Sequence, residues 1–183
     1  IDTKVHGSSH PLVADTRNNV AIVYKAQGKY EEALEEFSKA LDIRVSALGR
    51  DHPLVADTNL NIGVVYEKLG RYEEALVQYG KAQEVYVAVY GDMHPDVAST
   101  HLGLGNVHKA QGDYEKALFH YGKAQEVYVA VYGDMHLDVA ATHTNMGAVY
   151  ERQGRYAEAL EAYSKSLDIT VKIVGQDSPL VAD

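Results

Sequence analysis

The stretch that decides the fold is Asn61–Ala82, "NIGVVYEKLGRYEEALVQYGKA". Apolar and small residues recur in it at intervals of three and four residues on both sides of Gly70, as they do along the buried faces of amphipathic helices. Gly70 and Arg71 interrupt this pattern, and glycine is a favoured residue where a chain leaves a helix. The stretch therefore predicts two helices joined by a tight turn.

The same pattern returns along the chain at a fixed step of 42 residues. The step is kept by a glycine column and a tyrosine column, which consist of Gly28, Gly70, Gly112 and Gly154 and of Tyr30, Tyr72, Tyr114 and Tyr156. Four full repeats run over residues 10–51, 52–93, 94–135 and 136–177, and residues 1–9 and 178–183 are fragments of the same repeat. We predict a single repeat domain over residues 1–183. Because the chain starts at Ile1 rather than at Met, we also expect it to be a segment of a longer protein.

Each repeat is predicted to form one pair of antiparallel helices, which in the first repeat cover Pro11–Gln27 and Tyr30–Leu48. Proline is favoured at the first helical position, where its missing N–H would have no partner in the helix. Gly49 stands just past the second helix, where a C-cap favours glycine. A single helix pair cannot bury its apolar face, so neighbouring pairs must stack on one another. The chain is therefore expected to be all-α, an α-solenoid of stacked antiparallel helix pairs.

One duplicated stretch allows other interpretations. "YGKAQEVYVAVYGDMH" occupies Tyr79–His94 and returns unchanged at Tyr121–His136. Its Val-Tyr-Val-Ala-Val-Tyr centre alternates like a β-strand, and its Asp-Met-His end resembles a cluster of metal ligands. The aligned stretches of the first and fourth repeats show no such alternation. We therefore predict the second half of a helix, a glycine stop and the start of the next helix.

Composition limits the kinds of partner. The chain carries a formal net charge of −9, with no run of Lys or Arg, whereas nucleic acids and anionic membrane surfaces require a basic patch. No apolar stretch approaches the roughly 18 residues needed to span a bilayer. Cysteine is absent, which is compatible with a reducing compartment and leaves no disulfide. We expect a cytoplasmic protein that binds neither nucleic acid nor membrane.

A histidine begins every repeat, and the column consists of His10, His52, His94 and His136. Metal ligands must converge on one ion, but residues at one position of successive stacked repeats lie roughly 10 Å apart. Ser178 takes the place of this histidine in the last fragment, and serine is a favoured helix N-cap. We therefore interpret the column as N-caps and predict no metal site. His101, His108 and His143 are interpreted as polar packing residues of the first helices.

The sequence offers no recognisable catalytic machinery. It has no Cys nucleophile, no phosphate-binding glycine loop, no HExxH and no Gly-x-Ser-x-Gly. The acidic pairs Glu31–Glu32 and Glu73–Glu74 open second helices, where carboxylates interact favourably with the helix dipole. We predict that the protein is not an enzyme and needs no cofactor.

The core of each repeat, "G-[KRD]-Y-x-[EK]-A-L-x-x-[FY]", resembles the tetratricopeptide repeat. In the second repeat the small and aromatic positions of that family are held by Gly63, Tyr66, Gly70, Tyr72, Ala75, Tyr79 and Ala82. The "HPLVAD" leader and the long second helix extend the period to 42 residues, which is similar to the kinesin light chain subclass. The resemblance implies a right-handed solenoid whose first helices line a concave inner groove, and a role in binding peptides or proteins.

The resemblance also implies which residues would line the groove. We predict a peptide-binding set formed by Asn18, Ile22, Lys25, Leu60, Val64, Lys68, Leu102, Asn106, Lys109, Thr144, Ala148 and Arg152. Over all inward positions, four cations stand against four carboxylates, namely Asp15, Asp57, Glu67 and Glu151. This groove is neutral and lacks the Lys/Asn/Arg set with which some members hold a terminal carboxylate. The acidic cargo peptides associated with kinesin light chains therefore do not carry over directly.

We consider two main functions. The first is a non-enzymatic module that binds a peptide or protein partner in the groove. The alternative is a structural spacer that stacks end to end through uncapped terminal repeats, by way of Leu180, Val181 and the fragment Ile1–Val5. A third class is an enzyme whose catalytic domain lies outside this sequence.

Overall fold

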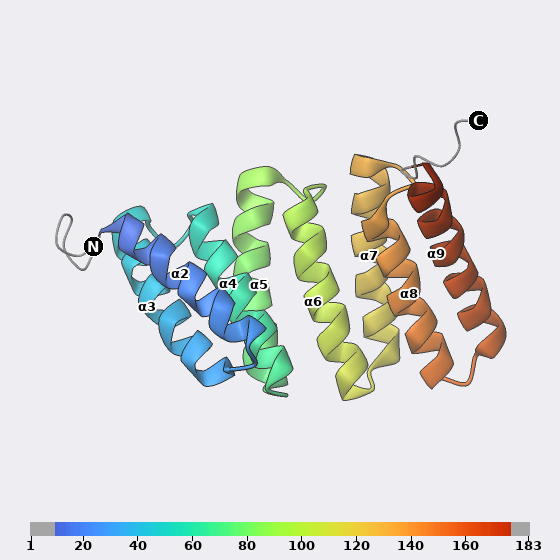
Figure 1. Ribbon diagram of the computed structural model, residues 1–183, viewed down its shortest axis with the longest axis horizontal. Coiled ribbons are helices and arrows are strands. Elements are labelled where there is room, and N and C mark those ends of the chain that lie inside the picture. The colour runs from blue at the N-terminus through green and yellow to red at the C-terminus, as the bar shows by residue number, and fades with distance from the viewer. Residues whose placement is uncertain (1–9, 177–183) are drawn as a thin grey trace. The chain divides into compact units, whose positions relative to one another are not determined.

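The computed structural model describes residues 10–176, which form eight α-helices joined by short turns (Figure 1). The helices are α2 (Pro11–Ala26), α3 (Tyr30–Leu48), α4 (Pro53–Lys68), α5 (Tyr72–Tyr90), α6 (Pro95–Gln111), α7 (Tyr114–Tyr132), α8 (Leu137–Arg152) and α9 (Tyr156–Gln176). No strand occurs among these residues. The predicted all-α architecture of helix pairs is confirmed. None of the described helices is both long enough and apolar enough to cross a membrane.

A histidine caps the first helix of every repeat. The Nδ1 atoms of His10, His52, His94 and His136 accept hydrogen bonds from the backbone N–H two residues further on, at 3.2, 3.2, 3.3 and 3.2 Å. All four residues have an extended backbone, as N-cap residues do. The predicted capping role is therefore confirmed for the whole column. Ser178, which suggested this role, lies outside the described residues.

Glycines end the second helices at the predicted places. Gly49, Gly91 and Gly133 have φ angles of 87°, 82° and 81°, which residues with a Cβ rarely adopt. The duplicated Val-Tyr-Val-Ala-Val-Tyr run is helical up to Tyr90 and up to Tyr132, so the helix prediction is confirmed against the strand. The first helix of the first repeat ends one residue earlier than predicted, because Gln27 forms its C-cap.

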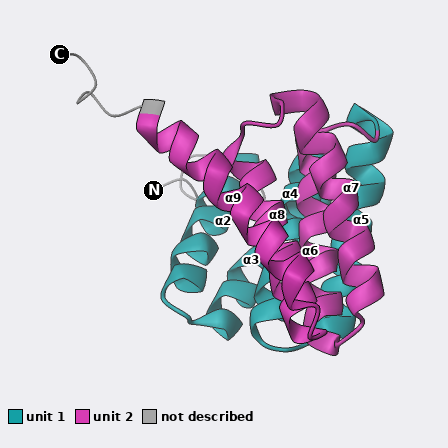
Figure 2. Cartoon of the chain, turned by 90° about the vertical axis from the view of Figure 1, so that its right-hand side faces the viewer, with its two compact units in different colours: residues 1–91 teal, residues 92–183 magenta. Residues whose placement is uncertain are grey.

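The chain divides into two compact units, residues 1–91 and residues 92–183, and each contains two repeats (Figure 2). In the first unit α2 packs against α3, α3 against α4, and α4 against α5. In the second unit α6, α7, α8 and α9 pack in the same order. The second helices α3 and α7 thus contact both their own first helix and the first helix of the next repeat in the unit. The single domain over the whole chain stays a prediction.

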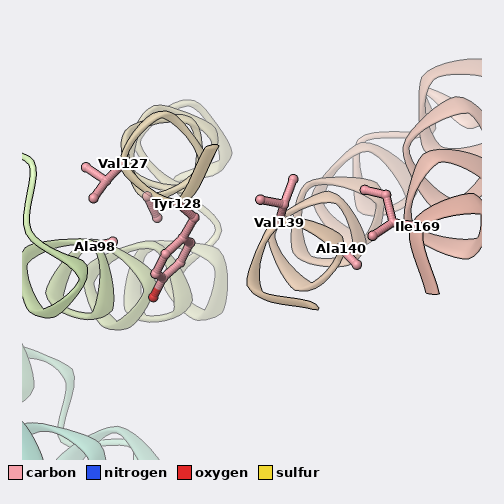
Figure 3. Packing of buried hydrophobic residues seen from close by; sticks show 7 residues of the cluster. Ala98, Val127, Tyr128, Val139, Ala140 and Ile169 are labelled. Atoms are coloured by element: carbon pink, nitrogen blue, oxygen red, sulfur yellow. The ribbon is translucent and has the colours of Figure 1, made fainter. Parts of the chain in front are cut away.

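The core of each unit consists of small and aliphatic residues, together with aromatic rings, on facing helices. In the first unit, one cluster joins α2, α3 and α4 through Ala21, Ala33, Leu34, Phe37, Ile62 and Val65. In the second unit, a cluster joins α6, α7, α8 and α9 through Ala98, Ala124, Val127, Tyr128, Val139, Ala140 and Ile169 (Figure 3). Burial of these side chains provides the main driving force for stacking helix pairs.

A glycine in three of the first helices makes room for a buried tyrosine of the second helix. A Cβ added at Gly63 would lie 2.8 Å from Cδ1 and Cε1 of Tyr79. The same close approach joins Gly105 to Tyr121 and Gly147 to Tyr163. The first repeat has Ala21 and Phe37 at these two positions, and both are fully buried. Small residues at this position therefore let the first and second helices of a repeat approach closely.

Candidate functional site

The predicted binding residues of α2 differ in how much of them is available to a partner. Ile22 is 39% exposed. Lys25 donates a hydrogen bond to Asn61 Oδ1 of α4 at 2.8 Å, so α2 and α4 lie side by side here, and burial lowers the pKa of the Lys25 amine. Asn18 is half-buried, and its Oδ1 is buried without a hydrogen-bond partner among the described residues.

The predicted residues of α4 differ in their exposure to solvent. Leu60 and Val64 are half-buried, and Lys68 is exposed at the last helical position. Lys68 makes no ion pair or hydrogen bond within residues 10–176. The first unit therefore presents an exposed isoleucine, two half-buried aliphatic side chains and a cation on its first helices.

In the second unit, one tyrosine holds two of the predicted residues. Tyr121 donates its hydroxyl hydrogen to Asn106 Oδ1 at 2.7 Å, and Lys109 Nζ lies 5.7 Å from the centre of the same ring. Leu102 is half-buried and packs against two core clusters. These three residues of α6 take part in packing within the second unit, which limits how far they can reach a partner.

The predicted residues of α8 are more accessible. Thr144 is exposed and shares a hydrogen bond of 2.8 Å with Ser166 of α9. Ala148 is half-buried. Arg152 is exposed at the last helical position, and no described residue pairs with it. It corresponds to Lys68 of the first unit, so each unit ends a first helix with an accessible cation.

Second helices hold the carboxylates that face the predicted groove. Arg44 of α3 forms an ion pair with Asp15 Oδ1 at 2.8 Å. One repeat later, the Tyr86 hydroxyl donates to Asp57 Oδ1 at 2.6 Å. Sequence reasoning treated the two aspartates as groove charges and missed these partners, which come from positions 29 residues further along the chain.

Two glutamates of the first helices are held in the same way. The Tyr79 hydroxyl donates to Glu67 at 2.9 Å, and the Tyr163 hydroxyl donates to Glu151 at 3.0 Å. Burial, together with the glutamate, raises the pKa of each tyrosine, so both hydroxyls stay protonated and keep donating. The carboxylates of this surface are therefore engaged by the chain itself, whereas Lys68 and Arg152 are not.

The structure also contains a cleft that sequence reasoning did not find. In the first unit the cleft has a volume of about 600 Å³ and lies between the second helices α3 and α5, with residues of α4 also lining it. Its lining residues are Leu41, Asp42, Val45, Ser46, Arg50, Asp51, Val55, Asn59, Lys81, Glu84 and Val85. The second unit has a smaller cleft of about 200 Å³ at equivalent positions. None of the twelve predicted residues lines either cleft. The two clefts could not be found from periodicity because they depend on how second helices of successive repeats diverge.

Three histidines of the third repeat pack together in the second unit. His101 Nδ1 and His120 Nδ1 lie at a hydrogen-bond distance of 2.9 Å, and the His108 and His120 rings stack with centres 5.5 Å apart. Burial, with the charges of the other two imidazoles, lowers the pKa of His120 to about 4. Among residues 10–176, no three His, Asp or Glu side chains gather in a group that could hold a metal ion.

Comparison with known proteins assigns the family. A tetratricopeptide repeat profile matches residues 1–44, 12–86, 54–129 and 96–172. The chain belongs to the tetratricopeptide repeat family. Its 42-residue repeat is of the kinesin light chain-like type, and members of this family generally act as non-catalytic scaffolds for protein interaction. No curated protein matches the sequence.

Solved structures of other proteins share the fold. BtubC (BKLC) from P. vanneervenii is 23% identical, with a TM-score of 0.81 over 95% of this chain and 72% of its own. A kinesin light chain-like protein with nearly identical TPR-like repeats from Podosopora anserina is 20% identical, with a TM-score of 0.74 over 96% of this chain and 82% of its own. The apo form of RapI is also 20% identical and has a TM-score of 0.76, over 89% of this chain and 57% of its own. At these identities the likeness concerns the fold.

Proposed function

We propose that this tetratricopeptide repeat protein is a non-enzymatic interaction module that binds a peptide segment of a partner protein along its first helices. The observation that carries the proposal is the availability of charge on this surface. Lys68 and Arg152 are exposed and unpaired within the described residues, while the nearby carboxylates are held by second helices. The proposal places this activity in the cytoplasm and requires no cofactor, nucleic acid or membrane.

The surface favours a particular kind of peptide. The ion pair with Arg44 neutralises Asp15, so four cations remain against three carboxylates among the inward positions. Exposed Ile22 and half-buried Val64 add an apolar patch on the first unit. A segment that combines an apolar side chain with a carboxylate suits both features, because the apolar contact adds specificity and the charge guides the encounter.

The contacts within the chain indicate which residues of the predicted groove set are suitable probes of binding. Asn106 and Lys109 are engaged with Tyr121, so substitutions there would disturb packing as well as binding. Ile22, Lys68 and Arg152 are better probes because they are exposed. Substitutions at exposed positions usually change the free energy of unfolding by less than about 0.5 kcal/mol.

Selection from a displayed peptide library against the whole chain tests the proposal. Selected peptides are then titrated against a groove variant, Ile22→Ser/Lys68→Glu/Arg152→Glu, and against a cleft variant, Lys81→Glu. We expect the groove variant to bind at least tenfold more weakly and the cleft variant to bind as the wild type does. The opposite result would move the site to the cleft between second helices, and unchanged binding by both variants would reject the groove.

A further inference from the structure

We infer that the cleft between α3 and α5 of the first unit binds a short peptide segment that combines an aliphatic side chain with a lysine or an arginine. This site is separate from the proposed groove on the first helices and does not depend on it. It is also independent of end-to-end stacking, which was expected through Leu180, Val181 and Ile1–Val5, residues that lie outside the described part of the chain.

The cleft contains a buried asparagine that has no hydrogen-bond partner. Asn59 of α4 lines the cleft and is only 6% exposed. Within residues 10–176, nothing forms a hydrogen bond with its side chain. Buried polar groups are nearly always hydrogen-bonded in folded proteins. The Asn59 amide, which offers one acceptor and two donors, is therefore available to a molecule that occupies the cleft.

The equivalent cleft of the second unit shows how this position is satisfied from within the chain. Two repeats further along, His143 takes the position of Asn59, and Gln125 takes that of Leu41. Gln125 Nε2 and His143 Nε2 lie 2.8 Å apart, at hydrogen-bond distance, and the cleft measures about 200 Å³ instead of about 600 Å³. Leu41 cannot form such a bond, so Asn59 stays unpaired in the larger cleft.

Four aliphatic side chains line the same cleft as Asn59, namely Leu41 and Val45 of α3, Val55 of α4 and Val85 of α5. The volume of the cleft falls within the range of about 300–1,000 Å³ that is typical of ligand-binding pockets. A peptide unit supplies one donor and one acceptor, which complement the two kinds of hydrogen-bonding atom in the Asn59 amide. The aliphatic residues suit an aliphatic side chain of the same segment, so the cleft favours a peptide.

The charged residues of the cleft favour a basic segment. Asp42, Asp51 and Glu84 line it together with Arg50 and Lys81, and all five are exposed. None of them forms an ion pair with another described residue. Carboxylates outnumber cations and come from both second helices, so a cation of the ligand is attracted and an anion is disfavoured. The proposed groove favours a carboxylate instead, and the charge of a peptide therefore separates the two sites.

Asp42 is available because the nearby lysine has other partners. Lys39 pairs with two glutamates of its own helix, at 2.6 and 2.7 Å. In the second unit the equivalent residues, Lys123 and Glu126, pair with each other at 2.9 Å. The first unit thus keeps an unpaired carboxylate on α3 where the second unit has an ion pair.

Calorimetric titration of the whole chain with capped hexapeptides tests the inference. One set of peptides combines leucine or valine with lysine or arginine, and a second set has glutamate in place of the basic residues. We expect peptides of the basic set to bind one per chain, and Asn59→Leu to weaken their binding at least tenfold. Because a buried amide without a partner lowers stability, the melting temperature of Asn59→Leu should equal or exceed that of the wild type.

Two further measurements locate the site. The side-chain amide signal of Asn59, identified by its absence from Asn59→Leu, should shift in nitrogen–proton NMR spectra when a basic peptide is added. Glu84→Lys and Asp168→Lys form a matched pair, because both carboxylates are exposed and occupy the same position of the two clefts. Glu84→Lys should weaken binding severalfold, whereas Asp168→Lys and the groove variant described above should bind as the wild type does.

Several results would overturn the inference. They are a failure of every basic peptide to bind, unchanged binding by Asn59→Leu, and equal binding of the acidic set. Weaker binding by the groove variant but not by Asn59→Leu would assign the peptides to the first helices. Where circular dichroism shows that Asn59→Leu has lost helix, Leu41→Gln replaces it, because a glutamine there offers Asn59 the partner that Gln125 gives to His143. That variant should also bind at least tenfold more weakly, and unchanged binding would be equally contrary.

Discussion

The close approach of Gly63 to Tyr79 leads to a prediction about a single methyl group. In Gly63→Ala the new Cβ would lie 2.8 Å from two ring carbons. The ring cannot easily move away, because Tyr79 is fully buried and its hydroxyl is bound to Glu67. We therefore expect the substitution to force strain into the contact between α4 and α5.

The expected magnitude follows from two opposing effects. Overpacking a tight core costs about 1–3 kcal/mol, whereas replacing glycine by alanine inside a helix gains about 1 kcal/mol. The net effect of Gly63→Ala is a loss of about 0–2 kcal/mol. Gly80→Ala is the matched control, because Gly80 lies on α5 and a Cβ there would meet nothing within 4 Å. That variant should be stabilised by about 1 kcal/mol.

Thermal and urea unfolding of both variants measure the difference, which should be about 1–3 kcal/mol, or about 2–4 °C in Tm for each kcal/mol. Tyr79→Phe should relieve part of the strain in Gly63→Ala, because the first repeat combines Ala21 with Phe37 in a fully buried contact. A double-mutant cycle isolates this coupling. Equal stabilisation by Gly63→Ala and Gly80→Ala would refute the reasoning, since it would mean that the ring does not press on the glycine.

Other parts of the structure give three further predictions. Arg44→Ala should lower the free energy of unfolding by about 2 kcal/mol, since it removes the partner of half-exposed Asp15 and the donor to Leu54 O and Thr58. Arg44→Tyr should lower it clearly less, because Tyr86 fills the same role for Asp57. Urea unfolding measures both changes. His52→Ala should lower the free energy of unfolding by about 1 kcal/mol, because it removes the N-cap. His52→Ser should lose much less, because serine is also a favoured N-cap. Equal melting temperatures for the wild type and the alanine variant would argue against the cap. The pKa values of His101, His108 and His120 lie below the ordinary value for histidine. The unfolded chain therefore binds more protons than the folded chain as the pH falls. The free energy of unfolding should thus be highest above about pH 6.5 and should fall as the pH drops towards about 4. His120→Gln should flatten the loss of Tm between pH 7 and 5, and an unchanged slope would contradict the assignment.

Periodic features of the sequence predicted the local structure because each depends on near neighbours. The helix ends at Gly49 and Gly91 follow from the left-handed backbone that glycine allows. The His52 cap follows from the proline after it and from the regular column to which it belongs. The Val-Tyr-Val-Ala-Val-Tyr run was correctly assigned to a helix because aligned repeats outweighed its own β propensity.

Features that depend on contacts between helices could not be predicted in this way. Arg44 stands in a column with Tyr86 and Tyr128, and nothing in its neighbours reveals that it is buried against Asp15. The engagement of groove carboxylates by tyrosine hydroxyls and the cleft beside Lys81 likewise depend on how whole helices are placed. Which of the twelve predicted groove residues meet a partner stays a prediction.

The pairing of Gly63 with Tyr79 has a consequence for how the gene can change. Both members lie within one repeat, as do Asp57 and Tyr86, and Ala21 and Phe37. Unequal crossing over that copies or deletes a whole 42-residue repeat keeps each matched pair together. A crossover between the two members of a pair can instead combine the alanine of the first repeat with the tyrosine of another. The two identical sixteen-residue stretches are therefore compatible with growth by whole repeats. The number of repeats can change in one step, while the fit inside each repeat is inherited intact.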